Sequence, residues 1–403
     1  MAPRRISILG STGSIGTQAL DVVRRARRNA GRDVFQVVAL AAGRSHLDVL
    51  AEQAVETEAA VVATSGGEDD ASHLSDLIIR CARDGGVENY RPCVLHGPDA
   101  AAEAAQVDQA HLVLNGITGS IGLVPTLAAL EAGKLLALAN KESLIAGGGL
   151  IQRAVENSPH EHPLIPVDSE HSAVAQSLRS GVPSEVDRLV LTASGGPFRG
   201  CRREELEAVK PADALAHPTW DMGLMVTTNS ATMVNKALEV LEAHLLFDIA
   251  LEQIDVVVHP QSVVHSMVQF TDGSTIAQAS PPDMRLPIAL GLAWPHRVPG
   301  AAIPCDWSTA TTWEFEPLDS TAFPAVDILK KAAAKSSTTP AVYNAANEQA
   351  VLAFHAGKIG FLQIVDTVER VVDEHVPATH LTVDTVLNAE QWARQRADHL
   401  LLG

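Results

Sequence analysis

The stretch Ile6–Arg25, ISILGSTGSIGTQALDVVRR, carries a strand pattern, a glycine turn and a helix pattern in that order. Ile6–Leu9 is short and apolar, as a buried strand is, and the segment from Gln18 has the period of a helix. Glycines at the start of a helix let backbone N–H groups approach a pyrophosphate closely. The arrangement favours a dinucleotide-binding turn, although its spacing is G-x-x-G-x-x-G, and a plain glycine-rich turn is the alternative.

The chain continues this alternation of strand-like and helical patterns up to about residue 160. It predicts an α/β domain with a Rossmann-like, doubly wound parallel sheet. A second glycine turn, Gly116–Gly122, follows another strand candidate, and we interpret it as a close backbone approach that lines the same cleft. The strand candidates after the first are Phe35–Ala42, Ala60–Ala63, His111–Leu114 and Lys134–Ala139.

The tip of the second strand candidate reads Gly43-Arg44-Ser45 and has no acidic residue. An NAD site usually places an acid there to bind the ribose 2′-hydroxyl. A guanidinium and a hydroxyl suit a 2′-phosphate instead. We therefore predict a preference for NADP over NAD.

Two polar segments follow later strand candidates. Asn140-Lys141-Glu142-Ser143 lies at the carboxyl edge of the predicted sheet, where ligands bind in open α/β folds, although Lys141 alone would be an ordinary surface lysine.

The segment PVDSEH, residues 166–171, follows a short apolar run. If it is extended, the carboxylates of Asp168 and Glu170 share a face and Ser169 points the other way. Two adjacent ionised acids require a metal ion, a shared proton or full solvation.

Two further segments have no clear period but carry polar or aromatic groups. Ser194-Gly-Gly follows the strand candidate Arg188–Thr192 and offers a hydroxyl and N–H groups, which suit a phosphate or an ordinary tight turn. The segment HPTWDMG, residues 217–223, is typical of a mobile lid or of an ordered connecting loop.

Residues 228–242 have the apolar spacing of one amphipathic helix. Asn235 and Glu239 lie four residues apart and share a face, with Lys236 beside them. These groups would form an internal ion pair, or they would supply a third acid for a metal and a cation for a phosphate. The β-rich stretch Asp255–Phe270 predicts a sheet that packs against such helices.

The amino-acid composition of the chain limits the kinds of partner that it can bind. The chain has 403 residues, 46% of them hydrophobic, and a net charge of -18. Its length predicts two or three domains, and the acidic balance argues against a nucleic-acid partner. We expect no targeting segment and no membrane partner, because the N-terminus leads directly into a strand and no apolar run has the length of a span. The four scattered cysteines favour a reduced, cytoplasmic setting.

Seven segments, in this order, closely resemble the 1-deoxy-D-xylulose 5-phosphate reductoisomerase family. The resemblance runs from Ile6 to the final helices. It implies an NADP-dependent oxidoreductase with an isomerase step, which converts 1-deoxy-D-xylulose 5-phosphate to 2-C-methyl-D-erythritol 4-phosphate in the methylerythritol phosphate route to isoprenoids. The segments are GSTGSIG, NKES, PVDSEH, SGGPF, HPTWDMG, NSATMVNKALE and HPQSVVHSM.

The resemblance also implies residue roles, and no matched metal or phosphate residue is missing. The expected ligands of a divalent Mn or Mg ion are Asp168, Glu170 and Glu239. The expected phosphate pocket is Ser194, Ser230, Asn235 and Lys236. Other expected substrate contacts are Lys141, Ser169, Glu170, His217, Trp220 and Glu239. The expected catalytic residues are Lys141, Asp168, Glu170, His217 and Glu239. The expected NADPH contacts are Thr12, Gly13, Ser14, Ile15, Gly43, Arg44, Ser45, Asn140, Glu142 and Gly223.

The same resemblance implies a homodimer and three domains. These are an NADPH-binding domain (1–160), a central α+β catalytic and dimerisation domain (161–295) with a flap near 214–224, and, after a linker (296–323), a C-terminal helical bundle (324–403). The bundle shows no catalytic constellation. Its helix candidates are Ala325–Lys335, Pro340–His355, Phe361–His375 and Leu387–Leu402.

The sequence leaves two other functions as alternatives. A simpler NADP-dependent dehydrogenase of another phosphorylated sugar or amino-acid precursor would need the glycine turn but not three convergent carboxylates. A redox sensor that binds NADP without catalysis would have no use for Asp168, Glu170 and Glu239.

Overall fold

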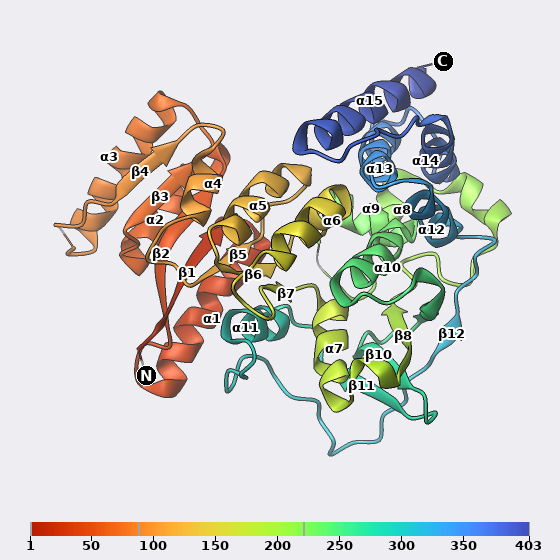
Figure 1. Cartoon of the computed structure of the whole chain (residues 1–403), viewed down its shortest axis with the longest axis horizontal. Helices are drawn as coiled ribbons and strands as arrows, with labels where there is room; N and C mark the ends of the chain where they lie inside the picture. The colour runs from red at the N-terminus through yellow and green to blue at the C-terminus, as the bar shows by residue number, and fades with distance from the viewer. Residues whose placement is uncertain (1, 88, 221, 403) are drawn as a thin grey trace. The chain divides into compact units, whose positions relative to one another are not determined.

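The computed structural model describes residues 2–87, 89–220 and 222–402. This part of the chain divides into two compact units, each built from separate stretches of sequence. Figure 1 shows the helices and strands of both, and each unit is described by itself below. The first unit comprises Met1–Ser143, Ile151–Ser172 and Asp283–Ile303, and the second comprises Leu144–Leu150, Ala173–Pro282 and Pro304–Gly403.

The first unit contains the predicted doubly wound sheet, and its strand pairs are all parallel over the described residues. The strand order is β4-β3-β2-β1-β5-β6-β7. The order reverses between β1 and β5, and ligands of open α/β sheets bind at such a reversal. The strands are β1 (Arg4–Leu9), β2 (Phe35–Ala42), β3 (Val61–Thr64), β4 (Cys93–His96), β5 (Leu112–Asn115), β6 (Leu135–Leu138) and β7 (Leu164–Pro166).

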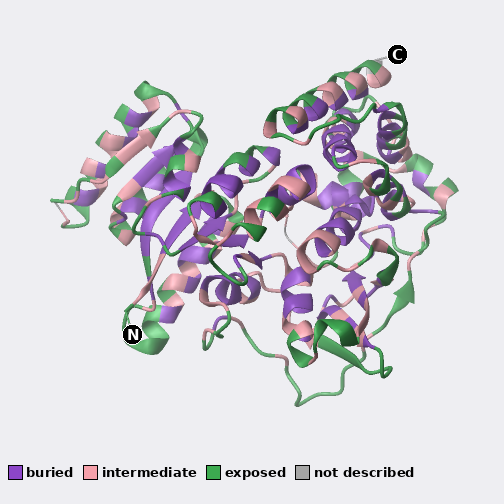
Figure 2. Ribbon diagram, in the orientation of Figure 1, coloured by how far each residue is buried: buried purple, intermediate pink, exposed green. Residues whose placement is uncertain are grey.

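Helices cover this sheet, and the strands between them are largely buried (Figure 2). The chain returns to the unit near its middle, where α11 packs against α1. Arg285 forms an ion pair of 2.6 Å with Asp21 of α1, and the Arg4 guanidinium donates to the Leu292 carbonyl oxygen at 2.9 Å. The helices are α1 (Ser14–Ala30), α2 (Leu47–Thr57), α3 (Glu68–Asp84), α4 (Ala100–Ala105), α5 (Leu123–Glu131), α6 (Lys141–Glu156), α7 (Ser169–Ser177) and α11 (Arg285–Ala293), of which α6 and α7 extend across the unit boundaries.

The second unit contains a mixed sheet of order β11-β10-β8-β9-β12. The β-rich stretch predicted over residues 255–270 forms β9 and β10, which both pair with β8. The pairing of β8 with β9 is parallel, and the other pairs are antiparallel. The strands are β8 (Val186–Ala193), β9 (Ile254–Val258), β10 (Val264–Phe270), β11 (Thr275–Ala279) and β12 (Glu316–Pro317).

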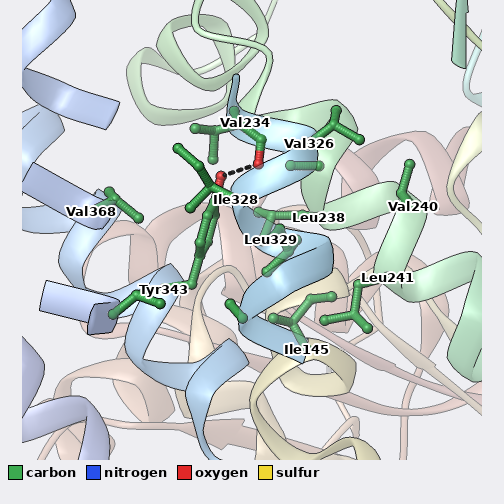
Figure 3. Close-up of a cluster of buried hydrophobic side chains, with 14 of the residues drawn as sticks. Ile145, Val234, Leu238, Val240, Leu241, Val326, Ile328, Leu329, Tyr343 and Val368 are labelled. Carbon is green, nitrogen blue, oxygen red and sulfur yellow. Dashed lines mark hydrogen bonds between the residues drawn. The ribbon is translucent and has the colours of Figure 1, made fainter. Parts of the chain in front are cut away.

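Helices of the second unit share a core with this sheet. Figure 3 shows part of it, where Leu238, Leu329 and Tyr343 from three helices come together. The buried Tyr343 hydroxyl donates to the Ala325 carbonyl oxygen at 3.2 Å, so its polar atom is satisfied. The helices are α8 (Pro211–Ala214), α9 (Leu224–Ala231), α10 (Val234–Phe247), α12 (Ala325–Lys335), α13 (Thr339–His355), α14 (Leu362–Glu374) and α15 (Val383–Leu402).

The prediction of one helix over residues 228–242 is wrong. Helix α9 ends at Ala231, α10 begins at Val234, and Met233 between them has a φ of 61°. A left-handed backbone is costly for methionine. The Met233 side chain is 2% exposed within an apolar cluster that includes Phe198, and this packing accounts for the break. The apolar spacing continues across the break, so the sequence pattern does not reveal it.

Candidate active site

The first glycine turn lies at the carboxyl end of β1, as predicted. The N–H groups of Gly10 and Ser11 donate to the Ala41 carbonyl oxygen of β2 at 2.8 and 3.0 Å. Gly10 has a φ of 77°, and a Cβ there would lie 2.7 Å from the carbonyl oxygen of Gly116. The second glycine turn therefore approaches the first closely, which agrees with the interpretation of that segment. The expected cofactor residues Thr12–Ile15 complete the turn and open α1.

The tip of β2 carries Gly43, Arg44 and Ser45, all exposed, at the start of a short 3₁₀ turn. Strands β1 and β2 are parallel neighbours, with Leu9 opposite Ala41. Because the carboxyl ends of neighbouring parallel strands meet at one edge, Arg44 and the glycine turn lie at the same edge of the sheet.

Asn140 joins the start of α6 to the second glycine turn. Its Oδ1 accepts the Ser143 N–H at 2.6 Å, which caps the helix, and its Nδ2 donates to the carbonyl oxygens of Ile117 and Gly119. Asn140 is 1% exposed, and its side-chain hydrogen bonds fix the direction in which α6 begins. Lys141 and Glu142 occupy the first turn of that helix.

The extended arrangement predicted for Asp168 and Glu170 is wrong. Strand β7 ends at Pro166, and Glu170 lies in the first turn of α7, which begins at Ser169. The Ser172 N–H donates to the Asp168 carbonyl oxygen at 2.8 Å, so the helical turn closes directly after the strand. Ser169 does not point away, because its hydroxyl donates to Glu170 Oε2 at 2.5 Å. A helix N-terminus favours carboxylates, which explains why both acids are accommodated here.

Asp168 is held in its ionised form. Burial alone would raise the pKa of the Asp168 carboxyl, but the Lys141 ammonium and His171 lower that pKa to far below its usual range. Lys141 Nζ lies 2.5 Å from Asp168 Oδ2. The first unit thus brings together four expected site residues, which are Lys141, Asp168, Ser169 and Glu170.

In the second unit, the turn after β8 presents Ser194. Gly195 and Gly196 follow it with φ values of 84° and 63°, which glycine adopts without strain. A Cβ on Gly196 would lie 3.0 Å from the Ser230 carbonyl oxygen of α9. The two glycines therefore allow the Ser194 turn to pack against the end of α9 that carries Ser230.

His217 has a defined tautomer. Its Nδ1 accepts the N–H groups of Thr219 and Trp220 at 3.1 and 2.9 Å, so the proton lies on Nε2. Nε2 is 3.0 Å from Ser194 Oγ and donates to it. Burial lowers the pKa of the His217 imidazole, which favours this neutral form.

The loop that contains His217 borders a pocket of about 500 Å³, which Ser194, Arg199 and Pro260 also line. Trp220 is half-buried, with its ring centroid 6.3 Å from that of His265. Gly223 precedes the first residue of α9. Of the expected flap over 214–224, Asp221 lies outside the described residues.

Helix α10 carries three expected residues in mutual contact. Asn235 Nδ2 donates to Glu239 Oε1 at 2.5 Å, and the Lys236 ammonium is paired with Glu239 Oε2. Lys236 and Glu239 are 4% and 1% exposed. Buried charges of this kind persist only when they are paired, so the internal ion pair left open by the sequence is present.

Two contacts from α13 to α9 had no signal in the sequence. Asn347 Nδ2 donates to Asn229 Oδ1 at 2.8 Å, and Thr228 Oγ1 is hydrogen-bonded to His355 Nε2 at 2.7 Å. Both α9 residues directly precede Ser230. Helix α13 therefore supports the candidate phosphate segment. More than 100 residues separate the partners, so the sequence alone does not reveal these contacts.

Comparison with family models covers most of the chain. Residues 6–148 match a model described as 1-deoxy-D-xylulose 5-phosphate reductoisomerase. Residues 164–247 match the 1-deoxy-D-xylulose 5-phosphate reductoisomerase C-terminal domain, and residues 279–396 match the DXP reductoisomerase C-terminal domain.

Similar proteins extend over the full length. The 1-deoxy-D-xylulose 5-phosphate reductoisomerase of Arthrobacter sp. (strain FB24) is 65% identical and covers 100% of this chain and 99% of its own. That of Kitasatospora griseola is 58% identical over 98% of this chain and 100% of its own. Among solved structures, the Zymomonas mobilis reductoisomerase in complex with NADPH has a TM-score of 0.88 at 39% identity, covering 99% of each chain. A DOX-P reductoisomerase in complex with NADPH, fosmidomycin and magnesium has a TM-score of 0.85 at 32% identity, covering 99% of this chain and 98% of its own.

Proposed function

The chain belongs to the 1-deoxy-D-xylulose 5-phosphate reductoisomerase family, and from that premise we propose a role for each site residue. The activity is the NADPH- and divalent-metal-dependent conversion of 1-deoxy-D-xylulose 5-phosphate to 2-C-methyl-D-erythritol 4-phosphate in isoprenoid biosynthesis. The observation that carries the proposal is that two of the three expected metal positions, Asp168 and Glu239, are carboxylates that are each paired with a lysine.

Asp168, Glu170 and Glu239 are proposed to bind one Mg or Mn ion. Carboxylate oxygens are the hard ligands that both ions prefer. The lowered pKa of the Asp168 carboxyl favours the ionised form that a metal ligand needs. Lys141 and Lys236 now neutralise Asp168 and Glu239, so a bound cation would take over that role and release two ammonium groups for the substrate.

Ser194, Ser230, Asn235 and Lys236 are proposed to bind the substrate phosphate. The close approach of the Ser194 turn to α9 supports this assignment, and Lys236 supplies a cation near the start of α10. Hydroxyl, amide and ammonium donors together match a phosphate dianion, for which charge-assisted hydrogen bonds are strong.

The remaining site residues are proposed to bind and enclose the rest of the sugar phosphate. Lys141, Ser169 and Glu170 would contact its hydroxyl and keto groups. Neutral His217 would donate from Nε2, and Trp220 would exclude water when the 214–224 flap closes. When bound, the cation supplies Lewis acidity at the substrate oxygens, and NADPH supplies the hydride.

NADPH is proposed to bind along the carboxyl edge of the first sheet. Thr12–Ile15 would bind its pyrophosphate, and Gly43, Arg44 and Ser45 its 2′-phosphate. Both segments follow the carboxyl ends of neighbouring parallel strands, and this shared edge supports the assignment. Asn140, Glu142 and Gly223 would complete the site.

We further propose that the protein is a homodimer in the cytoplasm, with functional domains over 1–160, 161–295 and 324–403 and a linker at 296–323. The family resemblance supports the homodimer and the domains, and the four free cysteines support the cytoplasmic setting. Among the helices of the described ranges, none has the length and apolar character needed to cross a membrane.

The function is tested by following NADPH absorbance in purified protein with 1-deoxy-D-xylulose 5-phosphate, with and without Mg or Mn, and by identifying the product. Oxidation of NADPH that needs both the sugar phosphate and a divalent ion is expected. Reduction of other phosphorylated sugars at an equal rate without a metal would favour a simpler dehydrogenase instead.

A further inference from the structure

A buried glutamine on α2 holds the peptide that follows Ser11 in the first glycine turn. Gln53 Nε2 donates to the Ser11 carbonyl oxygen at 2.9 Å, and Gln53 is 6% exposed. Both residues belong to the first unit. Neither the glycine motif nor the tip of β2 includes Gln53, which lies in the body of the next helix.

This contact fixes the direction of one N–H group. In a trans peptide the carbonyl of one residue and the N–H of the next point in opposite directions. Because the Ser11 carbonyl points to Gln53, the Thr12 N–H points away from Gln53. The Gly10, Ser11 and Gly13 N–H groups are bonded within the protein, whereas the Thr12 N–H has no hydrogen-bond partner among the described residues. Thr12 therefore presents a donor where an anion at the start of α1 would lie.

The Ser11 carbonyl has little room for another partner. A Cβ on Gly16 would lie 2.4 Å from this oxygen, so the backbone of α1 closes over it from one side. Without the Gln53 amide, a buried carbonyl would lose its hydrogen bond, which is costly. Rotation of the peptide would then turn the oxygen outward and the Thr12 N–H inward, and the outward oxygen would repel an anion.

We propose that Gln53 is a positioning residue for the dinucleotide pyrophosphate. It acts through the Ser11–Thr12 peptide and contacts neither cofactor nor substrate. The inference rests on the proposed function, because it requires that NADPH binds at this turn. It extends the cofactor site from the glycine motif to the buried face of α2.

The test compares Gln53→Met and Gln53→Glu with the wild-type protein. Methionine keeps the length of the side chain but has no donor, and glutamate places an acceptor opposite the Ser11 carbonyl. Thr57→Val is the matched control, because Thr57 donates to the Gln53 carbonyl oxygen on the same helix and loses that bond without touching the turn. Affinities for NADPH and for adenosine 2′-monophosphate, which has no pyrophosphate, are measured by titration, together with kcat and the substrate KM at saturating NADPH.

Both Gln53 variants are expected to bind NADPH at least about tenfold more weakly, as loss of a buried hydrogen bond implies, with Gln53→Glu the weaker. Adenosine 2′-monophosphate binding, kcat and the substrate KM should stay within about twofold, as should every value for Thr57→Val. Equal loss for the two nucleotides, or unchanged NADPH binding in both variants, would overturn the positioning role. Wild-type protein that fails to bind NADPH would overturn the function itself and the inference with it.

Discussion

Arg44 is the side chain that we propose to distinguish NADPH from NADH. It is exposed at the tip of β2, and the neighbouring tip residues, Gly43 and Ser45, carry no charge. We expect Arg44→Asp to weaken NADPH binding by about tenfold to a hundredfold, the range for a lost charge-assisted hydrogen bond, and NADH binding much less. Arg28→Asp, at an exposed position of α1, is the control for a change of charge. Equal losses for both cofactors would remove Arg44 from the 2′-phosphate site.

His217 should titrate below the usual range of histidine. Burial lowers its pKa, so on acidification the unfolded chain takes up this proton before the folded chain does. The stability that the neutral ring contributes is therefore fully present above pH of about 6.5 and decreases as the pH falls from there toward the folded pKa. Ring NMR signals, assigned by comparison with His217→Gln, should give a midpoint below 6.5 for the protein without substrate. A midpoint at or above 6.5 would show that burial is not the dominant influence.

Helix α2 is followed directly by a residue with a left-handed backbone. Glu58 follows its last turn with a φ of 49° and is exposed. Glycine adopts this conformation without strain, so Glu58→Gly should stabilise the protein by about 0.5–1 kcal/mol. Glu56→Gly, inside the same helix, should destabilise it by about 1 kcal/mol. Urea unfolding followed by circular dichroism measures both changes, and a loss of stability in Glu58→Gly as large as in Glu56→Gly would contradict the argument.

The elements differ in how well sequence reasoning predicted them. Strand β2 and helix α12 have the predicted bounds, because β2 is a nearly continuous apolar run and α12 has the apolar spacing of an amphipathic helix. The sequence does not predict strand β4, because Cys93–His96 has four residues and its apolar run is too short to indicate a strand. The break at Met233 and the start of α7 at Ser169 depend on packing and on helix-end hydrogen bonds, which periodicity does not record.

The proposed metal ligands are distributed over the two compact units. Asp168 and Glu170 belong to the first unit, and Glu239 belongs to the second. The motifs, together with the family resemblance, predicted candidate site residues, since each motif is local. The residues that hold these motifs in place could not be predicted. Gln53 and Asn347 form hydrogen bonds with segments that are far from them in the sequence.

We propose that Asp168, Glu170 and Glu239 bind one catalytic cation. This assignment is tested most directly by Mn titration of the wild-type protein, Asp168→Asn and Glu239→Gln, beside turnover at each metal concentration. Asp255→Asn, which alters an acid paired with Arg188 at the surface of the second unit, is the matched control.

Wild-type protein and Asp255→Asn should bind one Mn ion per chain. Asp168→Asn and Glu239→Gln should stay folded and keep NADPH binding, yet bind Mn at least about tenfold more weakly and recover turnover only in part with excess Mn. Normal turnover at low metal in either variant, or full activity of chelated wild-type protein, would contradict the claim.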